Sequence, residues 1–123
     1  MKNDKEKFKT DFKRRIYIWT IRLIKFLDAL PKDSITQRIS DQLFRSGSSV
    51  GANYIEAQAS ISKKDFTNFL HHSLKSGNES KFWFAILRDT NRGSSNDNKL
   101  LLDELTEISN ILAKSILTLK GKG

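Results

Sequence analysis

The chain has 123 residues, of which 37% are apolar and 29% are charged, and it carries a formal net charge of +8. This length suits one domain with its own hydrophobic core, and the lack of cysteine excludes disulfides, thiolate metal sites and cysteine nucleophiles. The polar start lacks a signal-peptide pattern, and Arg22 and Lys25 interrupt the most apolar stretch. We therefore expect a single cytoplasmic domain over residues 1–123, with no membrane partner.

The first periodic segment predicts a helix over about residues 5–29. Leu30 and Pro31 end it, because the residue before a proline avoids the α region. Spacings of three and four place one set of apolar residues on a single helix face. The residues of this expected core face are Phe8, Phe12, Ile16, Trp19, Leu23 and Phe26.

The same helix has a second apolar face on its opposite side, formed by Tyr17, Ile18, Ile21 and Ile24. A helix that is apolar on two faces is usually buried on two faces. The alternative is an irregular bundle that wraps around this helix. We expect the second face to form a contact between subunits.

The second helix is predicted over about residues 35–59, with Ser34 and Gln37 as a capping box. Its residues 46–52 are unusually small, and Gly47 and Gly51 weaken a helix by about 1 kcal/mol each relative to alanine. This pattern indicates that another helix approaches closely there. The expected core stripe is Ile35, Ile39, Leu43, Ser46, Val50, Asn53 and Ala57.

The third helix is predicted over about residues 63–88, capped by Ser62 with Asp65. Phe82 and Ile86 lie away from its core stripe and join the expected subunit contact. The fourth helix is predicted over about residues 99–119, after a polar loop at 90–98. Its core positions have the spacing of a left-handed bundle: Leu101, Leu105, Ile108, Leu112, Ser115 and Leu119. Short joints make neighbouring helices antiparallel, so we expect an all-α, up-down-up-down four-helix bundle.

The polar residues predict no catalytic centre. His71 and His72 are adjacent and project about 100° apart on a helix, so they cannot chelate one metal ion. We expect no enzyme activity, no cofactor and no metal. Instead, Asn53, Glu56 and Glu79 are expected to form a polar network, in which Asn53 bonds across the core to Ser76 or Ser80.

The positive charge points to polyanions. Residues 1–25 contain nine Lys and Arg but only three Asp and Glu, whereas the charges of residues 97–123 cancel. Because the sequence contains no motif that reads bases, we expect it to bind RNA or DNA through contacts with the phosphates. A protein-only scaffold is the alternative function. The expected nucleic-acid contacts are Lys13, Arg14, Arg15, Arg22, Arg38 and Arg45.

Several blocks resemble one known family. LPK at 30–32, DQLFRSGSSVGANYIEA at 41–57 and KDF at 64–66 resemble the four helix bundle protein family, also called the 23S rRNA intervening-sequence protein family. SLKSGNESKFW at 73–83 is similar to a third-helix block of one branch, and the resemblance runs over about residues 12–119.

The resemblance implies a ring-like homopentamer without enzymatic activity. It also implies similarity to the accessory variability determinant of diversity-generating retroelements, which binds a reverse transcriptase and nucleic acid through basic surfaces. The expected partners are therefore further copies of the chain, RNA or DNA, and a reverse transcriptase or another protein.

Overall fold

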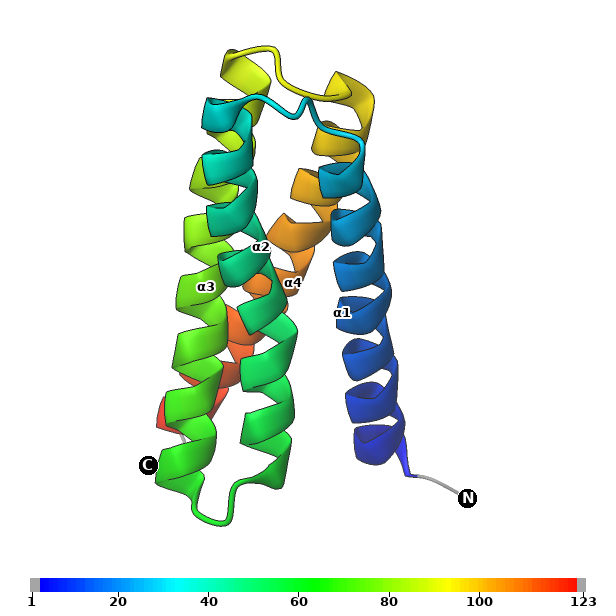
Figure 1. The fold of residues 1–123 in the computed structure, drawn as a ribbon. Helices are drawn as coiled ribbons and strands as arrows, with labels where there is room; N and C mark the ends of the chain where they lie inside the picture. The colour runs from blue at the N-terminus through cyan, green and yellow to red at the C-terminus, as the bar shows by residue number, and fades with distance from the viewer. Residues whose placement is uncertain (1–2, 122–123) are drawn as a thin grey trace.

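Residues 3–121 are described by a computed structural model, and they form four helices (Figure 1). These are α1 (Asp4–Asp28), α2 (Ser34–Ala59), α3 (Lys63–Asp89) and α4 (Ser95–Gly121). Each helix packs against the next, α4 returns to contact α1, and both ends of the described chain lie at the same end of the molecule. The predicted all-α four-helix bundle is confirmed.

The starts of α2 and α3 show which caps the chain uses. Ser62 Oγ accepts a hydrogen bond of 3.0 Å from the Asp65 N–H, so the predicted cap of α3 is confirmed. The predicted capping box of α2 is wrong. Asp33 caps this helix instead, with Oδ1 3.0 Å from the Thr36 N–H and Oδ2 2.8 Å from the Thr36 hydroxyl.

The fourth helix begins at Ser95, four residues before its predicted start. Ser94 Oγ accepts a 3.1 Å hydrogen bond from the Asp97 N–H and begins the helix. Asn98 is buried, and its amide donates a 3.0 Å hydrogen bond to the Phe84 carbonyl of α3. These polar residues therefore start and anchor a helix, and the connection from α3 is shorter than predicted.

The core lies between the four helices, and within it the buried rings of Trp19 and Phe84 meet edge to face, with ring centroids 6.3 Å apart. Phe8 is a wrong core prediction, because its side chain is 51% exposed. The N-terminal half of α1 diverges from the other helices (Figure 1), so no helix covers Phe8, which stacks on Phe12.

Two predicted core positions of α2 are also wrong. Ile35 is exposed and Asn53 is half-buried, whereas Thr36 and Tyr54 are buried in the same turns. In α4, Ile116 is buried beside a half-buried Ser115. Each error displaces the core stripe by one residue, about 100° around a helix.

The small segment of α2 packs closely against α1, as predicted. A Cβ added to Gly47 would overlap Leu23 Cδ2 and lie 3.4 Å from Trp19 Cη2. A Cβ at Gly51 would lie 3.1 Å from Ile16 Cγ2. The lack of a side chain at these two positions therefore lets the core residues of α1 approach the α2 backbone.

No helix within residues 3–121 combines the length and hydropathy that a membrane span requires.

Candidate nucleic-acid interface

The bundle divides into two halves of unlike charge. The basic half is the end at which the described chain starts and finishes, and comprises residues 3–15, 47–75 and 109–121. It contains eleven Lys and Arg against five Asp and Glu, a net charge of +6. The neutral half comprises residues 16–46 and 76–108, with nine of each sign. The net charge of the described chain therefore lies entirely in the basic half.

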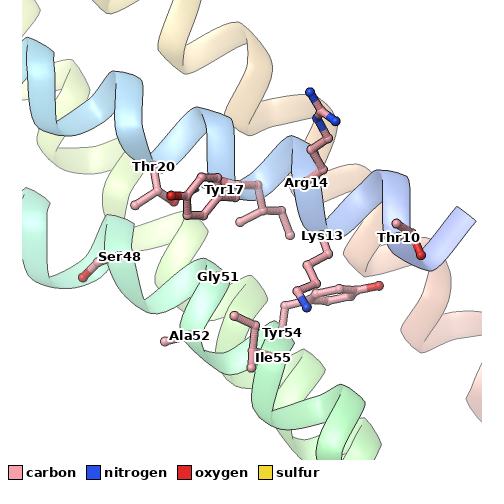
Figure 2. Close-up of a pocket in the computed structure, with 11 residues that line it drawn as sticks. Thr10, Lys13, Arg14, Tyr17, Thr20, Ser48, Gly51, Ala52, Tyr54 and Ile55 are labelled. Atoms are coloured by element: carbon pink, nitrogen blue, oxygen red, sulfur yellow. Dashed lines mark hydrogen bonds between the residues drawn. The ribbon is translucent and has the colours of Figure 1, made fainter.

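Lys13 and Arg14 lie at a groove of about 520 Å³ between α1 and α2 in the basic half (Figure 2). Both side chains are exposed, and none of the described acidic residues lines the groove. Arg14 points away from α2, whereas Lys13 extends toward Tyr54. The two cations are thus accessible from solvent along the outside of α1.

Arg15 forms ion pairs with two glutamates of α4. Its Nε and Nη2 atoms each lie 2.7 Å from a carboxylate oxygen of Glu104, and Nη2 is 3.3 Å from Glu107. The hydrogen bonds to Glu104 raise the pKa of Arg15, and the same contact lowers the pKa of Glu104. Arg15 therefore ties α1 to α4, and a phosphate would have to compete with two carboxylates for it.

The other three predicted contacts lie in the neutral half. Arg22 lines a hollow of about 430 Å³ between α1 and α4, together with Glu104. Arg38 is exposed on α2 and has no hydrogen-bond or ion-pair partner among residues 3–121. Arg45 forms an ion pair with Glu79 of α3. The six predicted cations thus do not form one surface.

The three residues of the predicted polar network, Asn53, Glu56 and Glu79, do not bond to one another. Glu79 accepts from Arg45 and, at 3.0 Å, from the Trp83 indole N–H. The expected bond from Asn53 to Ser76 or Ser80 is wrong, because the Asn53 amide donates at 2.9 Å to the Ser49 carbonyl of its own helix. The hydroxyl of Ser80 lies 2.8 Å from that of Ser46 instead.

Glu56 does not join this network, and within the described chain it has no hydrogen-bond or ion-pair partner. Likewise, no three His, Asp or Glu side chains among residues 3–121 come together as a metal-binding group.

Sequence reasoning missed a second group of cations in the basic half. Lys63, Lys64 and Lys120 line a hollow of about 430 Å³ between the start of α3 and the end of α4. These lysines are far from α1 in sequence. The predicted up-down topology could have revealed this group, because it places the start of α1, the start of α3 and the end of α4 at the same end of the bundle.

The residues of the predicted subunit contact are mostly exposed, but they lie on two separate helices, α1 and α3. Tyr17 is 66% exposed, and Ile18, Ile21 and Ile24 are less so. Phe82 is 56% exposed on α3, whereas Ile86 packs partly against the core. Two exposed side chains of α2, Phe44 and Ile55, were missed because they fall outside the core stripe.

These features define a small all-α bundle with one basic half and exposed apolar side chains on all four helices. A family model described as 23S rRNA-intervening sequence protein matches residues 9–114. The chain belongs to this family.

A solved structure agrees with this assignment. The crystal structure of a protein with unknown function from the S23 ribosomal protein family of Bacteroides thetaiotaomicron VPI-5482 is 31% identical to this chain. The match covers 85% of this chain and 97% of that chain, with a TM-score of 0.77. A search of curated proteins gave no match.

Proposed function

We propose that this protein is a non-enzymatic nucleic-acid-binding or ribonucleoprotein accessory protein that contacts the phosphate backbone of RNA or DNA. The observation that carries the proposal is the net charge of +6 in the basic half, against zero in the other half. A concentrated positive field attracts a polyanion without reading its sequence. The family description, which refers to intervening sequences of 23S rRNA, is in keeping with an RNA partner.

Within the predicted set, Lys13, Arg14 and Arg22 are the residues of α1 that we assign to phosphate contact. Lys13 and Arg14 belong to the basic half and are exposed, and Arg22 is exposed a little more than two turns further along α1. Arginine suits this role because its planar fork binds phosphate through two hydrogen bonds. Arg15 and Arg45 are held by carboxylates and are left out of this set.

Fluorescence anisotropy with labelled 20-nucleotide single strands and 20-base-pair duplexes tests this proposal. The wild type should bind both with little sequence preference. The variant K13Q/R14Q/R22Q should bind more weakly than the wild type. The slope of its log affinity against log salt concentration should also be smaller in magnitude by about 2 to 3, because each lost phosphate contact lowers that slope by about 0.7 to 0.9.

The matched control is K32Q/K81Q/R88Q, which removes the same charge from the neutral half and should bind more tightly than the first variant. If the assembled wild type binds no oligonucleotide at 0.1 M salt, the protein-only scaffold becomes the better account.

The second candidate function is a homo-oligomeric scaffold, and the exposed apolar side chains favour it. We propose that the chain self-associates as a closed ring, for which the family resemblance implies five subunits. Tyr17 of α1 and Ile55 of α2 line one groove, and Ile21 follows Tyr17 by about one turn of α1, while Phe82 is exposed on α3. Since α1 and α3 are diagonal in the bundle, these are two different surfaces. A contact between unlike surfaces is heterologous, and its repetition closes a ring when the rotation between successive subunits is a whole fraction of a full turn.

A mixing experiment distinguishes a heterologous contact from a symmetric one. I21E removes the α1 patch and F82E removes the α3 patch, because each would bury an unpaired charge at the contact. Each variant alone should be monomeric by light scattering, whereas an equimolar mixture should form a dimer through the one intact pair of patches. N110E, at an exposed site of α4, should assemble like the wild type. A monomeric wild type at micromolar concentration, or an F82E variant that still assembles, would contradict the proposed heterologous contact.

A further inference from the structure

None of the residues assigned to phosphate contact above lines the hollow between the start of α3 and the end of α4. We propose that it is a second phosphate-binding station, at which Lys63, Lys64 and Lys120 hold the backbone of a nucleic acid that α1 also contacts. This inference rests on the proposed nucleic-acid binding and adds residues from two other helices to it.

The first support is the accessibility of the three ammonium groups. Lys63, Lys64 and Lys120 are all exposed. Within the described chain, none of their ammonium groups has a hydrogen-bond or ion-pair partner. They differ in this respect from Arg15 and Arg45, whose charges are already balanced by carboxylates.

The second support is the lack of nearby negative charge. Within the described part of the chain, neither Asp nor Glu lines the hollow, although Asp65 follows directly after two of the lysines. In addition, residues 109–121 contain two lysines and no acidic residue. Three positive charges around a concave surface of about 430 Å³ form a local site for an anion.

The remaining lining residues suit a phosphodiester more than an apolar partner. The Thr67 hydroxyl donates its proton to the Lys63 carbonyl at 2.9 Å, and its oxygen can still accept. The Asn68 side chain is exposed, and its amide can donate to a phosphate oxygen. Among residues 3–121, Leu119 is the only apolar residue of the lining, so the hollow offers little surface to an apolar helix or a stacked base.

The position of the hollow sets the path of the bound strand. It lies between α3 and α4, and α3 is the helix diagonal to α1 in the bundle. A backbone that reaches both Arg14 and the hollow must therefore cross the end of the molecule at which the described chain starts and finishes (Figure 1). The nucleic acid thus contacts α1 and continues across the basic end to the hollow.

The variant K63Q/K64Q/K120Q in the full chain tests this inference by anisotropy with a 30-nucleotide single strand. At 0.1 M salt we expect affinity to fall about tenfold or more, and the salt dependence to flatten by about 2 to 3, because three phosphate contacts are lost. The matched control K32Q/K81Q/K99Q removes three lysines from the neutral half. Both variants should melt cooperatively near the wild-type temperature, since five of the six substituted side chains are exposed and Lys81 is half-buried.

The outcomes separate this inference from the proposed function. If the wild type binds and both triple variants bind alike, the hollow is not a phosphate station, while backbone binding by α1 stands. If only the α3–α4 variant loses affinity, the second station is supported. If the wild type binds no nucleic acid, the proposed function fails and this inference fails with it.

Discussion

Replacing Trp19 by alanine is expected to lower the free energy of unfolding by about 4 to 5 kcal/mol, near the upper end for a buried aromatic side chain. Trp19 is 1% exposed and contacts the ring of Phe84 across the core. Its indole N–H also donates a 2.9 Å hydrogen bond to the Leu101 carbonyl of α4. The substitution would leave a cavity where three helices meet and remove a link between α1 and α4. Chemical denaturation followed by circular dichroism measures the loss.

Trp83 provides the internal comparison. It is half-buried near the surface of α3, and its indole N–H bonds to Glu79. Trp83→Ala should cost less than half as much as Trp19→Ala, because the space it leaves opens to solvent. Equal losses for the two variants, or a loss below about 2 kcal/mol for Trp19→Ala, would show that Trp19 is not the centre of the core.

Gly47→Leu is expected to destabilise the bundle by about 3 kcal/mol or more, through overpacking. Even a Cβ at this position would overlap Leu23, which is fully buried, and the rest of a leucine side chain would press against Trp19. The approximately 1 kcal/mol gained by removing a glycine from a helix cannot offset that clash. The helices α1 and α2 would have to separate, and the loss should appear as a lower denaturation midpoint with a nearly unchanged slope.

Ala52→Leu is the matched control, since Ala52 is an exposed residue of the same helix. It should change stability by no more than about 0.5 kcal/mol. Gly51→Leu should fall between the two, because a Cβ at Gly51 meets Ile16 less tightly and the position borders the open groove. An unchanged midpoint for Gly47→Leu would contradict the close approach of α1 to α2.

Most of the fold follows from local patterns. The spacing of apolar residues predicts the four helices, and the small segment around Gly47 predicts the close packing of α2. The start of α4 could not be predicted from polarity, since Ser94 and Asn98 look like loop residues. Their roles as a cap and as a buried hydrogen-bond donor depend on the Phe84 carbonyl, which belongs to another helix.

Phe8 shows that apolar periodicity alone cannot predict which side chains are buried. Its periodicity is that of a core residue, but periodicity does not report whether another helix is present to cover it. The divergence of α1 from its neighbours leaves this ring exposed (Figure 1). Tyr54 and Asn53 differ by a single position, and a one-residue error in the stripe was enough to assign the wrong side chain to the core.

The candidate site was less predictable because charge was counted along the chain. That count finds Lys13 and Arg14 but also includes Arg15, whose guanidinium is occupied by Glu104, a residue 89 positions away. It omits Lys63 and Lys120, which become neighbours only when α3 and α4 pack antiparallel. Ion pairing and proximity between distant residues are properties of the packed bundle and are not visible in any single segment.

The difference in net charge between the basic half and the neutral half gives the molecule an electric dipole along its long axis. A free molecule that drifts toward a polyanion would experience a torque before any atoms touch, and its basic end would turn to face the surface. Orientation would then be settled during the encounter, and productive collisions would become more frequent. Raising the ionic strength shortens the range of this torque to a few ångströms, about 3 Å at 1 M salt, so capture should slow more than release accelerates.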